Sequence, residues 1–118
     1  MSEDEALNYI NTSNDVDFLL TKAIAYLRRR HPTASPQEQL DIEAQIPLME
    51  GKQANIRADK TAFNAETLAI NPPTKPQIDT IRKHSTDLDT MITNSQNANS
   101  ILVLVTAAAN EWNNTRSA

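Results

Sequence analysis

Hydrophobic residues recur at helical spacing along most of this chain, and two proline-containing breaks divide the pattern. The breaks are HPTASP at residues 31–36 and NPPTKP at residues 71–76. Each contains a helix-start signal, because Ser35 and Thr74 are followed three residues later by Glu or Gln, as in a capping box. Breaks this short join antiparallel neighbouring helices. The pattern therefore predicts an all-α protein, an elongated antiparallel three-helix bundle with coiled-coil-like packing.

The segment before the first break is predicted to hold a short extra helix at about residues 3–11 and a longer one at 13–30. Leu7 and Ile10 mark the short helix, and the polar run NTSND at 11–15 then interrupts the apolar pattern. After this run the apolar residues again follow helical spacing up to the first break.

The segment from 36 to 70 carries apolar residues seven positions apart, which indicates one helix with a coiled-coil-like seam. These residues are Ile42, Met49, Ile56, Phe63 and Ile70. The companion seam positions are mostly polar: Ile46, Gln53, Lys60 and Thr67. Pro47 lies inside the segment and removes a backbone hydrogen bond, so we expect a kink near residues 43–47.

The segment from 75 to 114 is predicted to be one long helix. Its first half has one narrow apolar stripe, and from residue 98 a second stripe begins: Ala98, Ile101, Val105, Ala108 and Trp112. The apolar run ILVLV at 101–105 should therefore be covered from a wide arc. The polar run NSQNANS at 94–100 reads either as a weak point in this helix or as a hydrogen-bonding surface for a partner.

Helix lengths predict which part of the bundle lacks cover. A helix from 13 to 30 is about 27 Å long and one from 75 to 114 about 60 Å, so residues 53–95 should form a two-helix arm. Apolar side chains of this arm should be incompletely covered and should form an interface with another protein or with a second copy of the chain. They are Ile56, Phe63, Ile70, Ile78, Ile81 and Leu88.

Composition narrows the classes of partner and compartment. The chain has 118 residues, which suits a single helical domain spanning 1–118, and its one glycine disfavours sheets and tight hairpins. Its net charge of -4 argues against nucleic acid binding. It contains no cysteine, and its acidic start lacks the apolar stretch of a signal peptide. We expect a cytoplasmic protein, or one exported without a conventional N-terminal signal.

No catalytic, nucleotide-binding or metal-binding motif stands out. His84 and Asp87 are spaced three apart and could share a metal, but this spacing is equally that of a local charge pair on a solvated helix face. We therefore expect a non-enzymatic protein with no cofactor and no metal.

The segment NPPTKPQI, residues 71–78, followed by NSQNANS, resembles the helical hairpin of type III secretion needle subunits. Those proteins join two helices by a proline-bracketed turn and carry an Asn/Gln/Ser-rich stretch in the second helix. The resemblance covers about a third of the chain. It differs in its longer turn and in the N-terminal helix, which needle subunits do not need, and it assigns no role to individual residues.

The expected function is a protein–protein interaction module, which could be an adaptor, an inhibitor or an assembly subunit acting through the two-helix arm. The resemblance implies the alternative of a subunit in a helical-hairpin secretion or filament assembly. A membrane-active helical protein that exposes residues 101–105 is a further alternative. This apolar run is too short to span a bilayer, which needs about 20 residues, so membrane association is not expected.

Overall fold

The computed structural model describes residues 1–116, which form four α-helices. They are α1 (Glu3–Arg30), α2 (Pro36–Asn64), α3 (Lys75–Thr93) and α4 (Ala98–Asn113), with a 3-10 turn η1 (His31–Thr33) between α1 and α2. The molecule is elongated, with extents of 49 × 24 × 20 Å. The all-α class is confirmed. The three-helix arrangement is not, because residues 1–116 form four main helices: α1 is a single helix, and the segment predicted as one helix from 75 to 114 is divided into α3 and α4.

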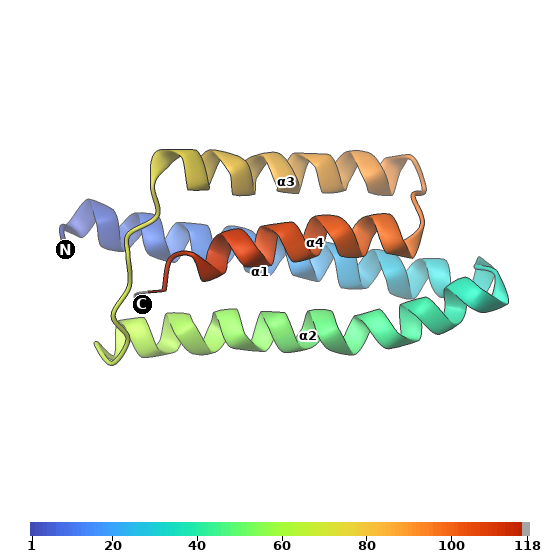
Figure 1. Ribbon diagram of the computed structural model, residues 1–118, viewed down its shortest axis with the longest axis horizontal. Helices are drawn as coiled ribbons and strands as arrows, with labels where there is room; N and C mark the ends of the chain where they lie inside the picture. Colours follow the sequence, from blue (N-terminus) through green and yellow to red (C-terminus); the bar gives the residue numbers. More distant parts are fainter. Residues whose placement is uncertain (117–118) are drawn as a thin grey trace.

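The helices run alternately up and down, and the N-terminus lies at the same end as the last turn of α4 (Figure 1). Helices α1 and α4 occupy the centre, because each packs against all three other helices. Among the described residues α2 and α3 do not pack against each other. The connection at 65–74 therefore crosses the end of the bundle (Figure 1). The helical hairpin that the sequence suggests across NPPTKP is not formed.

The core is built mainly from α1 and α4. Helix α4 buries the stripe that begins at residue 98: Ala98, Ile101, Val105, Ala108 and Trp112. Within the ILVLV run, Leu104 is also buried, Leu102 is half-buried and Val103 is exposed. The expectation of wide coverage for this run is confirmed, because three helices pack against α4 and leave only one side of it exposed.

Helix α1 is continuous through the polar run where the sequence predicts an interruption. Thr12 and Ser13 are buried, and Asn14 on the outer side accepts a hydrogen bond from Lys60 (2.8 Å). Packing along the full length of α1 outweighs the modest helix propensity of these residues. The division into helices 3–11 and 13–30 is therefore wrong.

The predicted single helix from 75 to 114 is also wrong, because α3 ends at Thr93 and the Asn-rich run forms the turn and the start of α4. Ser95 adopts a positive φ of 54°, and the N–H groups of Ser95 and Gln96 bond back to Ile92 and Met91 (3.1 and 3.0 Å). This pattern is the Schellman motif that ends helices. Asn97 then caps α4 by accepting a bond from the Ser100 N–H (3.0 Å). Asn and Ser prefer such caps to helix interiors.

Helix α2 ends at Asn64, six residues before the predicted end at 70, and by the same motif. Glu66 has φ 60°, and its N–H bonds to the Phe63 carbonyl (3.0 Å). Upstream, α2 is continuous through Pro47, and its first part is inclined to the remainder in Figure 1. Beyond the helix, the Asn71 N–H donates to the Thr115 carbonyl (2.7 Å), which fixes the crossing segment to the C-terminal end of the described chain.

The predicted N-caps are present. Ser35 accepts a bond from the Glu38 N–H (3.2 Å), and Thr74 forms a complete capping box with Gln77. The Glu38 carboxylate does not complete the capping box by accepting a bond from the Ser35 N–H. It bonds instead to Arg30 and to the Ala98 N–H.

Ser95→Gly is expected to raise the free energy of unfolding by about 1 kcal/mol, because a side chain in the left-handed region costs roughly this much and glycine has no Cβ. Urea denaturation followed by circular dichroism would measure the change. The exposed Thr93→Gly, inside the last turn of α3, should instead destabilise the protein. A loss of stability in Ser95→Gly would contradict the account of this turn.

Candidate functional site

The six residues predicted as a partner interface do not form an exposed arm. Ile56 is 3% exposed, and Ile81 and Leu88 are fully buried in the core. The other three, Phe63, Ile70 and Ile78, are half-buried. The reason is the length of α1, which runs the whole bundle and covers the region that a short helix would have left open.

An aromatic cluster shows this covering directly. The Tyr9 ring lies 4.5 Å from the Phe63 ring and 4.8 Å from the Trp112 ring, centre to centre. Tyr9 comes from the first part of α1, which the sequence assigns to a separate short helix. The three rings, tilted to one another, join α1, α2 and α4 at the end of the bundle that was expected to be open.

A polar cluster holds the opposite end of the bundle, and we term it the Glu38 clasp: Tyr26, Arg30 and Glu38, with the backbone of residues 95–98. Glu38 accepts bonds from Arg30 Nε (2.9 Å) and from the Ala98 N–H (2.9 Å). Arg30 also donates to the Ser95 carbonyl (2.9 Å), and the Tyr26 hydroxyl donates to the Gln96 carbonyl (2.6 Å). The clasp therefore fixes the α3–α4 turn against α1 and α2.

The electrostatics of the clasp favour the charged carboxylate. Burial raises the pKa of Glu38, but the Ala98 N–H and the Arg30 guanidinium outweigh it and hold that pKa below its ordinary value. The Glu38 side chain is 14% exposed, so water competes only weakly for these bonds. The cluster is accordingly a structural fastener whose donors and acceptors are used within the chain.

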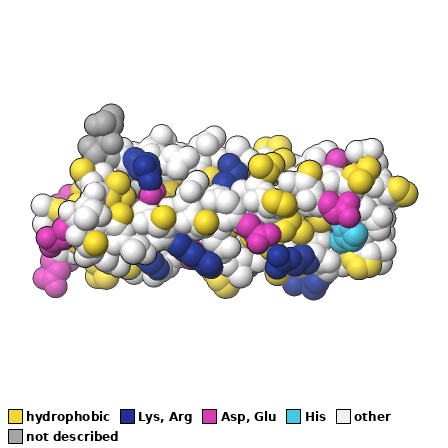
Figure 2. All heavy atoms as spheres, turned by 90° about the horizontal axis from the view of Figure 1, so that it is seen from below, with side chains coloured by type: hydrophobic (Ala, Val, Ile, Leu, Met, Phe, Trp, Pro, Cys, Tyr) yellow, Lys and Arg dark blue, Asp and Glu magenta, His cyan; other side chains and the backbone are white. Residues whose placement is uncertain are grey.

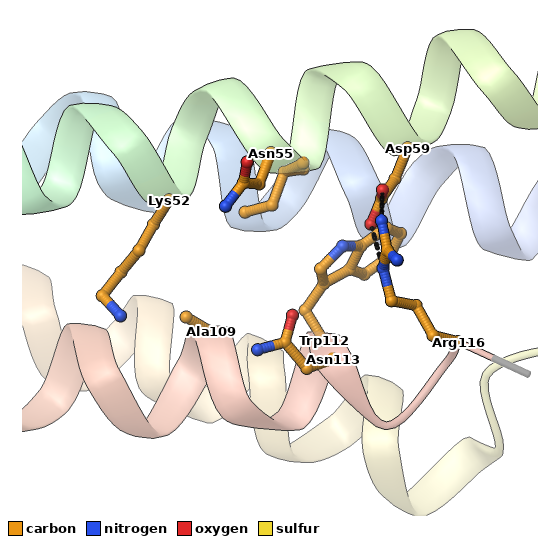
Figure 3. Close-up of a pocket in the computed structure, with 8 residues that line it drawn as sticks. Lys52, Asn55, Asp59, Ala109, Trp112, Asn113 and Arg116 are labelled. Carbon is orange, nitrogen blue, oxygen red and sulfur yellow. Dashed lines mark hydrogen bonds and ion pairs between the residues drawn. The ribbon is translucent and has the colours of Figure 1, made fainter. Parts of the chain in front are cut away.

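A groove of about 310 Å³ separates α2 from α4 near the C-terminal end (Figure 3). Its lining is Lys52, Asn55, Ile56, Asp59, Ala109, Trp112, Asn113 and Arg116. Arg116 Nε donates to Asp59 (3.0 Å), and the second guanidinium nitrogen contacts the other carboxylate oxygen. Asp59 is 4% exposed and is neutralised by this pair. Lys52 is then the remaining charge of the groove.

Two buried polar atoms lie near this ion pair. Within residues 1–116 the Tyr9 hydroxyl and the Trp112 indole nitrogen have no hydrogen-bond partner. Burial, with the Asp59 carboxylate as a second cause, raises the pKa of Tyr9 to about 12. The Tyr9 hydroxyl therefore stays protonated at neutral pH. The arrangement seals this end of the bundle and lacks the pairing of nucleophile and base that acyl transfer or hydrolysis needs.

Metal-binding groups are not assembled in the described part of the chain. Residues 1–116 contain no group of three or more His, Asp or Glu side chains placed to hold an ion. Asp87, one member of the His84 pair considered above, instead accepts a bond from Lys83 (2.7 Å).

The outward side of α2 has a different character, and we term it the α2 outer face. It consists of exposed, uncharged residues over five turns of the helix: Leu40, Ala44, Pro47, Leu48, Gly51, Ala54 and Ala58. Leu40 and Leu48 are 61% and 59% exposed. Figure 2 views the molecule from this side and shows hydrophobic groups along much of its length. Single exposed leucines are ordinary on protein surfaces, but a continuous uncharged face is not.

The sequence contains a signal for this face that is separate from the seam through Ile42, Met49 and Ile56. Positions 40, 44, 47, 51, 54 and 58 alternate steps of four and three, which is a second heptad pattern in the same helix. Its members are small, apart from Leu40 and Pro47, so hydrophobicity alone ranks it below the stripe through Ile42, Met49 and Ile56. That larger stripe forms the core, and the smaller one faces outward.

No helix among the described residues is both long and apolar enough to cross a membrane. Comparison with protein-family models, with curated proteins and with solved structures gave no match to this chain.

Proposed function

We propose that the protein is a non-enzymatic interaction module that binds another protein chain through the α2 outer face. The observation that carries the proposal is the uncharged surface from Leu40 to Ala58 in a chain whose residues are 22% charged. Full burial of a leucine side chain is worth roughly 1.5–3 kcal/mol. Covering Leu40 and Leu48 would therefore contribute substantially to binding.

The shape of the face suits a helix as the bound element. Between and beyond the two leucines the surface consists of alanines, Pro47 and Gly51, and no atom lies within 4 Å of the position a Gly51 side chain would take. Small residues let a second helix approach closely, with its ridges in the grooves of α2. Charged residues border the face, with Glu43, Glu50 and Arg57 on the α1 side, and can orient the bound helix.

A photo-reactive amino acid at position 48 would test the proposal in cells that express the protein naturally. We expect covalent adducts of higher mass after illumination, because Leu48 lies in the middle of the face. The matched control is the same amino acid at Val103, which is 71% exposed on α4 and lies outside the face.

Equal labelling from both positions, or no adduct from position 48, would contradict the proposal. Adducts that contain only further copies of the chain would favour an assembly subunit over an adaptor or inhibitor. Circular dichroism of each variant checks that the helices remain folded.

A further inference from the structure

We infer that the occupant of the α2 outer face is a second copy of this chain, packed antiparallel to the first about a two-fold axis at Gly51. The inference rests on the proposed function, since it names the partner of the same face. Three observations support it: the order of large and small residues along the face, the positions of the charges beside it, and the space around Gly51.

The order of side-chain sizes is self-complementary in this arrangement. A two-fold axis at Gly51 places residue 48 level with residue 54 of the second copy, and residue 44 level with residue 58. Leu48 then meets an alanine, Ala44 meets Ala58, and Leu40 lies level with Ala62. Each leucine of the face thus falls opposite an alanine, as interdigitated packing without voids requires.

The centre of the face permits the closest approach. The two copies of Gly51 meet at the axis, where neither has a side chain and where the surrounding space is open. Glycine at a helix crossing lets two backbones come together, whereas within an isolated helix it costs about 1 kcal/mol relative to alanine. A contact between helices at this point would offset that cost.

The charges beside the face favour the antiparallel orientation over the parallel one. An antiparallel two-fold brings the α1 side of one face against the α1 side of the other. Glu43 then lies two residues, about 3 Å along the axis, from the level of Arg57 in the second copy. Glu43 is 58% exposed and Arg57 59%, so both can reach a partner while Arg57 keeps its bond to Asp17. A parallel pair would place the α1 side of one face against the opposite side of the other, so that Glu43 and Arg57 would not meet.

One like-charged pair lies next to the axis and is already compensated. The two Glu50 side chains approach each other there, but each lies 3.5 Å from Arg28 of its own chain. Each Glu50 charge is thus compensated within its own chain.

The size of the face sets the expected strength of association. Residues 40–62 span about 33 Å, and a strip about 10 Å wide gives roughly 700 Å² for both copies together. Stable interfaces bury about 1,200 Å² or more, so the dimer should be weak and should form only at high protein concentration.

Single-cysteine variants provide the test, because the chain has no cysteine of its own. Oxidised Gly51→Cys at high concentration is expected to give at least about tenfold more disulfide dimer than Ala107→Cys, an exposed α4 control. A mixture of Ala44→Cys and Ala58→Cys should give mainly the mixed dimer, which reports the antiparallel register. Sedimentation equilibrium of the unmodified protein should show mass rising with concentration, and Leu48→Asp should abolish the rise.

Equal dimer yields from positions 51 and 107, or a monomer mass at all concentrations, would overturn the inference. If position 48 still captured a different protein in cells, the proposed function would stand and only the identity of the partner would be wrong. If position 48 captured nothing and no dimer formed, both would fail. A preference for Ala44–Ala44 disulfides over mixed ones would refute the antiparallel arrangement.

Discussion

Glu38→Gln is expected to lower the free energy of unfolding by about 2–3 kcal/mol, the range for losing charge-assisted bonds at a largely buried site. The carboxylate accepts from both Arg30 and the Ala98 N–H (2.9 Å each), whereas glutamine has only one accepting oxygen. The NH₂ group of the glutamine would face an N–H donor and could not bond to it, and Arg30 would lose its counter-charge. Urea denaturation at neutral pH measures the change.

The same carboxylate predicts a pH dependence. Because the pKa of Glu38 is lowered in the folded protein, its contribution to stability is fully present above the unfolded pKa and is lost as pH falls through the folded pKa. The stability of the wild type should therefore fall towards acid pH more steeply than that of Glu38→Gln. The control is Glu43→Gln, whose side chain is 58% exposed and lies 3.4 Å from His31. Identical pH profiles for wild type and Glu38→Gln would show that the clasp does not stabilise the fold.

Leu88→Ala is expected to lower the free energy of unfolding by about 2–5 kcal/mol, as for other fully buried leucines. The half-buried Ile78 makes a matched comparison on the same helix, and Ile78→Ala should cost less. Chemical denaturation of both variants would measure this difference. If the Leu88→Ala variant were as stable as the wild type but no longer bound a partner, the interface expected from the sequence would be correct, and Leu88 would not be a buried core residue.

Much of the helical architecture follows from local signals. The N-caps at Ser35 and Thr74 are visible because a side-chain oxygen must satisfy free backbone N–H groups at a helix start. The wide coverage of α4 can be predicted from the sequence, because two apolar rows on one helix require cover from more than one direction. Both signals depend on residues close together in sequence.

The sequence-based helix boundaries were wrong where local patterns and the folded structure disagree. Thr12 and Ser13 read as a break, yet packing of α1 against three helices keeps the chain helical there. Conversely, the heptad pattern of apolar residues continues in register past Ser95 and Asn97 and so predicted one helix. Ser95 instead adopts the left-handed turn that ends α3, and Asn97 caps the start of α4. The expected exposure of Leu88 and Ile81 followed from these two errors, and the longer α1 covers both residues.

The α2 outer face was missed for a different reason. Its residues are small, so each contributes little to a hydrophobic pattern, and only exposure in the folded chain distinguishes Ala54 or Ala58 from a core alanine. The Asp59–Arg116 pair joins residues far apart in sequence and gives no local signal.

The crossing segment at 65–74 has a consequence for how the protein folds. The α1–α2 and α3–α4 hairpins each form from neighbouring sequence, whereas contacts of α1 with α3 and α4, and of α2 with α4, close longer loops. Folding rates fall as contacts become more distant in sequence, so the meeting of two largely formed hairpins should be the slow step. The Asn71–Thr115 bond and the Asp59–Arg116 pair can form only after that step, and they would be the first contacts to break when the hairpins separate.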